Sequence, residues 1–187
     1  MPSNSVIVRF AALDAPALML VYGLLRLIDG LDSARDPGDL AWIAGHLAFF
    51  AAMVLFGVLA VGLRRIAPPG AGPVATVAAA MTLSGVAAFL WVIAGDLSPA
   101  FRAAAPLPEP LQVAGPLLFA LGMLTLLGLM VAARRAPAWS PLMFGAGIVA
   151  LTLDVDNLPL AALILLAALA PLARPDRRRA GLTRRYV

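Results

Sequence analysis

LAWIAGHLAFFAAMVLFGVLAVGLRR, residues 40–65, is an apolar run that ends in a pair of arginines. From Leu40 to Leu63 its only ionisable side chain is His46. As a helix this segment would be about 36 Å long at ~1.5 Å per residue, which exceeds the ~30 Å thickness of a bilayer's hydrocarbon core. The run therefore predicts a transmembrane helix.

Apolar segments of similar length recur on both sides of this run. The last of them, Ala138–Leu172, is interrupted by Asp154-Val155-Asp156-Asn157. Its halves are close to the lower limit of about 17 residues for a spanning helix, so they form either two short crossings or a hairpin that enters and leaves on one side. Together the segments predict an all-α polytopic transmembrane bundle of about six helices at 1–173 and a basic tail at 174–187; the other three are Val6–Ile28, Pro73–Ala94 and Leu111–Ala133.

Composition excludes several classes of chemistry. The chain is 62% hydrophobic, against about 45–50% for a soluble domain. It has no cysteine, which excludes disulfides and thiolate ligands, and no lysine, which excludes a Schiff base. No catalytic or cofactor motif is recognisable, so we expect no cofactor and favour a non-enzymatic protein. We expect no nucleic-acid partner, because the arginines flank apolar segments as topology signals do.

The distribution of charge predicts the orientation. Arginines follow the second and fourth apolar segments and fill the tail, whereas the intervening loops are rich in aspartate. The positive-inside rule places such arginines in the cytoplasm. We therefore predict a multi-pass protein of the bacterial plasma membrane with both termini cytoplasmic; the determining residues are Arg64, Arg65, Arg134, Arg135, Arg177, Arg178 and Arg179.

A weak internal similarity appears at an offset of 70 residues. It aligns residues 39–65 with residues 109–135, and the identical pairs include Gly45 with Gly115, Phe49 with Phe119 and Met53 with Met123. Both segments end in an arginine pair. The pattern favours a two-helix unit used repeatedly in one orientation, although topology signals in a biased composition would also produce part of it.

His46 is the only histidine and the main candidate for function. Asp39, Trp42 and His46 are spaced to share one helix face, and His46 would lie about 10 Å inward from Asp39. An ionisable group within a membrane segment is a functional candidate, but a histidine that bonds a neighbouring helix is equally ordinary. The candidate ligand or metal site at the outer end comprises His46, Asp39, Trp42, Asp29, Asp36 and Asp96, with solvated loop charge as the alternative.

The stretch Asp36-Pro-Gly-Asp-Leu-Ala-Trp-Ile-Ala-Gly-His46, followed by an apolar helix ending in Gly-Leu-Arg64-Arg65, resembles small uncharacterised multi-pass membrane proteins of high-GC bacteria. The resemblance is one of general sequence character over most of the chain and includes no diagnostic motif. It implies a membrane protein and transfers no functional residue.

Three functions remain open at this level. The first is a non-enzymatic accessory, assembly or sensory membrane protein, whose partners are the lipid bilayer and a membrane protein or a second copy. The small residues Ala80, Ser84 and Ala88 would permit close helix approach in such a protein. The second is a small permeation or carrier protein built from helical hairpins. The third is a metal-binding protein that uses His46 and the outer carboxylates.

The predicted topology can be tested by cysteine labelling in intact cells, since the chain has no cysteine of its own. We expect cysteines at positions 36, 96 and 156 to react with a membrane-impermeant maleimide. Cysteines at positions 65 and 135 should react only after permeabilisation. Reaction at 65 or 135 in intact cells would contradict the predicted orientation.

Overall fold

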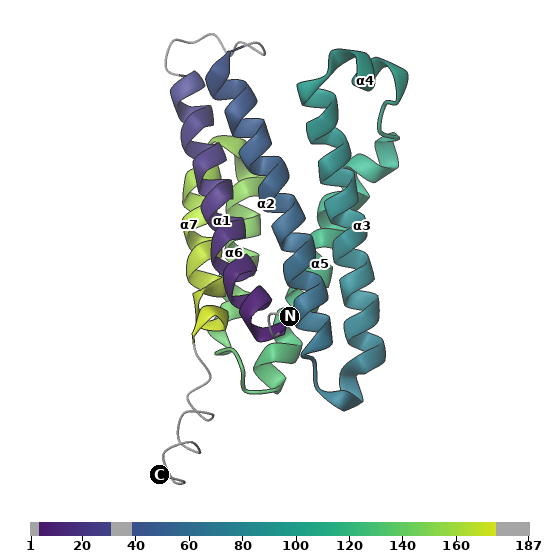
Figure 1. Ribbon diagram of the computed structural model, residues 1–187, viewed down its shortest axis with the longest axis vertical. Helices are drawn as coiled ribbons and strands as arrows, with labels where there is room; N and C mark the ends of the chain where they lie inside the picture. Colours follow the sequence, from purple (N-terminus) through teal and green to yellow (C-terminus); the bar gives the residue numbers. More distant parts are fainter. Residues whose placement is uncertain (1–3, 31–38, 175–187) are drawn as a thin grey trace.

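Three antiparallel helical hairpins make up the computed structural model, which describes residues 4–30 and 39–174 (Figure 1). Each hairpin joins two helices that are adjacent in the chain, apart from short connecting elements. No strand occurs among the described residues. The hairpins are α1 (Asn4–Asp29) with α2 (Leu40–Arg65), α3 (Gly72–Leu97) with α5 (Glu109–Ala132), and α6 (Trp139–Leu153) with α7 (Leu158–Leu169).

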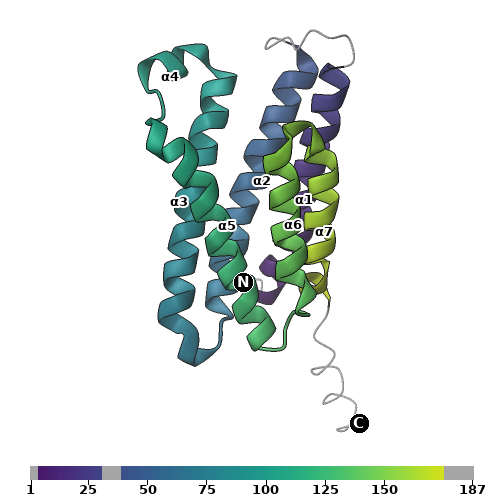
Figure 2. The same ribbon diagram turned by 180° about the vertical axis from the view of Figure 1, so that it is seen from behind.

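Length and hydropathy give the class of the fold. Five of the described helical segments are long and apolar enough to cross a membrane. The sixth, α6, has 15 residues and a length of about 22 Å at ~1.5 Å per residue. Figures 1 and 2 show that the α6–α7 hairpin ends below the tips of α1 and α2. The predicted all-α bundle of membrane-protein type is confirmed, with one hairpin shorter than the others.

Two features of the helices were not predicted. α1 runs unbroken from Asn4, with Pro16 inside it. A helix that continues through Pro16 is favoured because its first turns bury Val8 and Ala12 against the rest of the bundle. The sequence analysis also missed α4 (Pro99–Ala104), although Ser98 followed by proline is a usual helix start, and the Ser98 hydroxyl accepts from the Phe101 N–H.

Opposite charges gather at the two ends of the bundle. We call the end that carries the α2–α3 and α5–α6 connections the arginine end, and the opposite end the acidic end. At the arginine end Arg9 Nε donates to the Ala173 carbonyl at 2.8 Å, which joins the start of α1 to the 3₁₀ turn Ala170–Ala173 after α7. Arg135 donates to the Ile66 carbonyl in the α2–α3 connection.

α2 and α5, the second helices of the first two hairpins, bury equivalent faces. Most buried residues of α5 lie 70 positions after buried residues of α2. The arginine pairs differ, however: Arg64 and Arg65 are inside α2, whereas Arg134 follows α5 in a left-handed conformation with φ of 56°. The shared buried positions are 45 and 115, 52 and 122, 53 and 123, 56 and 126, 57 and 127, and 60 and 130.

The core lies where the three hairpins meet. Phe119 of α5 packs edge-on against Phe56 of α2, with ring centroids 5.3 Å apart, and also contacts Phe144 of α6 at 6.2 Å. Met53 and Met123 are buried in the same cluster. One cluster of aromatic rings therefore joins a helix from each hairpin.

The α3–α5 crossing depends on glycine. A Cβ atom on Gly122 would overlap the Thr82 hydroxyl and the Ala78 carbonyl of α3, and one on Gly85 would overlap the Gly115 carbonyl and Phe119. In a bilayer, helices associate through such close backbone contact because lipid is as apolar as leucine.

Replacing Gly122 by alanine should destabilise the protein. We expect Gly122→Ala to cost about 1–3 kcal/mol through overpacking, despite alanine's better helix propensity. The measurement is SDS- or urea-induced unfolding in mild detergent.

Gly128→Ala is the matched control on the same helix, because nothing lies within 4 Å of its Cβ position. It should be neutral or stabilising by up to about 1 kcal/mol. Equal destabilisation by both variants would contradict the close crossing.

Candidate functional site at the acidic end

His46 joins two hairpins at the acidic end of the bundle. Its side chain is buried, with 4% exposed, and faces inward from α2. Its Nε2 lies 3.7 Å from Asp96 Oδ2 near the end of α3. The sequence analysis named both residues as candidates, and the structure brings His46 and Asp96 together across 50 positions of sequence.

The other ring nitrogen of His46 contacts its own helix. Nδ1 lies 2.8 Å from the Trp42 carbonyl oxygen one turn earlier. A carbonyl can only accept, so Nδ1 carries a hydrogen and donates it to Trp42. Nε2 is thereby directed toward Asp96, and the imidazole links α2 to α3.

Aromatic rings enclose the imidazole. The Trp42 ring lies 4.2 Å from the His46 ring, and Tyr22 of α1 approaches edge-on at 5.3 Å. The Trp42 indole Nε1–H is buried and has no acceptor among the described residues. The imidazole thus sits in a mostly apolar setting with an unused donor beside it.

Arg102 holds the far side of Asp96. The chain turns back after α3 into α4, which places Arg102 Nη2 2.5 Å from Asp96 Oδ1. A cavity of about 210 Å³ lies beside this pair. Trp91 and Phe101 line it, and the Trp91 indole donates to the Ala105 carbonyl at 2.8 Å. Asp96 therefore has a cation on one oxygen and His46 near the other.

Of the other predicted carboxylates, Asp29 and Asp39 are among the described residues, and neither forms an ion pair with His46. Asp39 is exposed and caps α2 by accepting from the Leu40 N–H at 2.6 Å. Asp29 is buried at the end of α1, and Asp36 lies outside the described residues. Among the residues that the structure describes, no three His, Cys, Asp or Glu side chains are grouped to hold a metal ion. The observed site is a His46–Asp96–Arg102 chain.

The tip of the α6–α7 hairpin forms a second ionic contact. Arg26 Nε lies 3.4 Å from Asp156 Oδ1. A Cβ atom on Gly23 would overlap Leu158 and Pro159, so this tip packs closely on α1. The short hairpin therefore ends beside Arg26, where Asp156 meets its guanidinium.

The buried interior of the described part of the bundle has few polar side chains. Besides His46 and Asp29, the buried polar side chains among the described residues are Thr82 and Ser140. Thr82 donates to the Ala78 carbonyl at 2.9 Å, and Ser140 donates to the Ala168 carbonyl at 2.6 Å. Each of these hydroxyls satisfies a helix carbonyl and does not line a channel.

Asp14 is a polar residue within an otherwise apolar part of α1, five residues beyond Arg9. At ~1.5 Å per residue it is about 7 Å deeper along the helix than Arg9. Its side chain is exposed, and no described residue supplies it with a hydrogen-bond donor or a cation. The sequence analysis did not include it among the candidate site residues.

Comparison with known proteins gives no relative: no family model, curated protein or solved structure matches the chain. The fold and the site define a polytopic helical membrane protein with an ionic contact between hairpins at one end.

A double-mutant cycle tests the contact between hairpins. We expect His46→Asn and Asp96→Asn to show a coupling free energy of about 1 kcal/mol in detergent unfolding, because the two groups face each other. In the control cycle, His46→Asn is combined with Asp154→Asn, which alters a residue that caps the α6–α7 turn. That pair should be additive within about 0.5 kcal/mol. Additivity in both cycles would show that the His46–Asp96 contact has no energetic role.

Proposed function

We propose that this protein is a non-enzymatic accessory or assembly subunit that docks a transmembrane helix of a partner protein on the outer face of α1. The observation that carries the proposal is the exposed carboxylate of Asp14 within an apolar surface. A carboxylate that faces hydrocarbon is unfavourable, so such groups usually meet a partner.

The position of Asp14 relative to the membrane supports this. Arg9 and Arg26 are 17 residues apart on α1, or about 25 Å, which is close to the ~30 Å hydrocarbon thickness. Asp14 lies between them. Long arginine side chains at these positions can reach the interface, whereas an aspartate side chain is too short to do so.

The exposed face around Asp14 has the spacing of a helix-packing seam. Its residues alternate in steps of four and three, as the a and d positions of a heptad do. A single polar residue in such a seam specifies the partner and the register. The seam consists of Phe10, Asp14, Ala17, Val21, Leu24 and Ile28, all exposed.

The chemistry of the partner follows from the carboxylate. A helix that offers Arg, Lys or His at matching depth would pair with ionised Asp14. A second copy of this chain, related by a two-fold axis along the seam, would instead oppose Asp14 to itself and require a shared proton. The unpaired carboxylate therefore favours a different chain with a basic or strongly donating residue.

The other two functions have less support. A carrier needs a polar-lined path, and the described interior is apolar with its hydroxyls bonded to helix carbonyls. A metal site needs several ligands, whereas His46 is near the single carboxylate of Asp96.

In-cell photocrosslinking tests the docking face. A photoreactive amino acid at position 17 or 21 should crosslink to one membrane protein, identified by mass spectrometry. That partner should carry a basic or strongly donating residue within a membrane segment. Asp14→Leu should reduce the crosslinked fraction about tenfold, as expected for loss of a buried charged pair.

Ala17→Phe should also abolish the complex by obstructing the seam. Ala87→Phe is the matched control, because Ala87 is an exposed alanine on α3. Crosslinks to lipid alone, a crosslinked second copy, or a yield unaffected by Asp14→Leu would each refute the proposed partner.

A further inference from the structure

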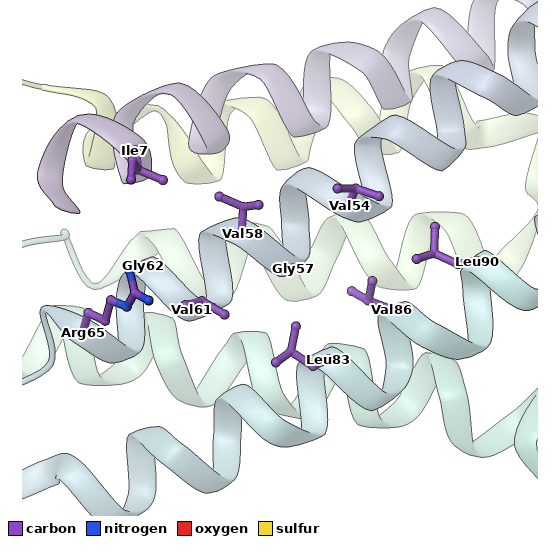
Figure 3. A pocket seen from close by; sticks show the side chains of 10 residues that line it. All are labelled: Ile7, Val54, Gly57, Val58, Val61, Gly62, Arg65, Leu83, Val86 and Leu90. Atoms are coloured by element: carbon purple, nitrogen blue, oxygen red, sulfur yellow. The ribbon is translucent and has the colours of Figure 1, made fainter. Parts of the chain in front are cut away.

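An apolar groove runs between α2 and α3 toward the arginine end, with the start of α1 at its edge (Figure 3). Its volume is about 430 Å³. Val54, Val58 and Val61 form one side of the groove, and Leu83 and Leu90 form the other. It is separate from the His46 site and from the Asp14 seam.

Gly57 explains why the groove is hollow. It stands between Val54 and Val61 on α2 and contributes no side chain where Leu83 and Val86 of α3 approach. A Cβ atom there would be 3.4 Å from Leu83 Cδ2, so the helices are at ordinary contact distance below the groove. The groove is thus a surface channel over a packed α2–α3 contact.

Arg65 gives the groove a cationic end. Figure 3 shows Arg65 at one end of the row of lining side chains and Leu90 at the other. Arg64, its neighbour, donates from Nε to the Thr76 hydroxyl at 3.0 Å. Arg65 has no such acceptor among the described residues, so its guanidinium remains available to an anion.

The dimensions of the groove match one leaflet. Val54 and Arg65 are 11 residues apart, which is about 16 Å at ~1.5 Å per residue. Half of the hydrocarbon core is about 15 Å. An apolar channel of this length with a cation at the membrane surface is complementary to a phospholipid, whose acyl chain and phosphate have the same separation of polarity.

We infer that this groove binds an anionic phospholipid of the leaflet at the arginine end, with one acyl chain along α2 and α3 and the phosphate on Arg65. Guanidinium groups pair with phosphate through parallel hydrogen bonds, which favours a phospholipid over an uncharged chain. The site would hold the lipid at a fixed place on the helix bundle.

Photocrosslinking in nanodiscs tests the inference. The full-length protein is reconstituted with trace phosphatidylglycerol carrying a diazirine in its acyl chain, and separately with phosphatidylcholine carrying the same chain. Adducts are mapped by mass spectrometry. We expect phosphatidylglycerol adducts to concentrate on 54–61 and 83–90 and to exceed those of phosphatidylcholine at these positions.

Two matched pairs of variants make the result specific. Arg65→Gln should lower the phosphatidylglycerol adducts in the groove about fivefold, because one arginine near an anionic surface contributes an effect of this size. Arg64→Gln should change these adducts little. Val58→Phe should fill the channel and reduce adducts of both lipids, whereas Val77→Phe on an exposed position of α3 outside the groove should not.

Even labelling of all lipid-facing helices, equal labelling by the two lipids, or equal loss with Arg64→Gln and Arg65→Gln would overturn the inference. Displacement of the adducts by a co-purifying membrane protein would also overturn it, because the groove would then be a protein interface.

Discussion

Close contact between helix backbones at small residues is the constraint on which this bundle depends. In hydrocarbon the hydrophobic effect does not drive helices together, so packing and interhelical hydrogen bonds must do so. Gly122 and Gly85 bring α3 against α5, and Gly62 brings α2 against Val8 of α1. Ser140 then ties α6 to the Ala168 carbonyl near the end of α7. Each hairpin thus has a close contact or a hydrogen bond between its own two helices.

The hairpins meet one another through further contacts. The α1–α2 hairpin meets its neighbours through the edge-on aromatic pair Phe56 and Phe119, and through ionic contacts at the acidic end. His46 connects α2 to Asp96, and Arg26 connects α1 to Asp156, where Gly23 also lets the α6–α7 tip pack closely on α1. The features left for interaction with other molecules are on the outer faces, where Asp14 and the Arg65 groove lie.

These two outer features rest on one physical argument. A charged side chain near the edge of a bilayer is stable when it is long enough to reach water or lipid headgroups. A charged side chain that is shorter and lies deeper in the hydrocarbon needs a protein partner. Arg65 belongs to the first case and Asp14 to the second. The same reasoning underlies both proposals, lipid in the α2–α3 groove and a protein partner on the α1 seam.

The sequence by itself determined the helices, the break at Asp154–Asn157 and the separation of arginines from aspartates, because hydropathy and charge are local properties of the chain. It also singled out His46. It missed α4, although Ser98-Pro99 is a local start signal. It did not show that α1 continues through Pro16, which the packing of Val8 and Ala12 favours.

Only the tertiary structure decided which residues meet. His46 pairs with Asp96, Asp14 turns outward, and Arg65 closes a groove, because each outcome depends on the rotation of a helix about its axis and on the neighbour it faces. Those rotations are set by contacts between residues far apart in the chain, such as Gly122 with Ala78. Periodicity along one helix cannot specify them when nearly every face is apolar.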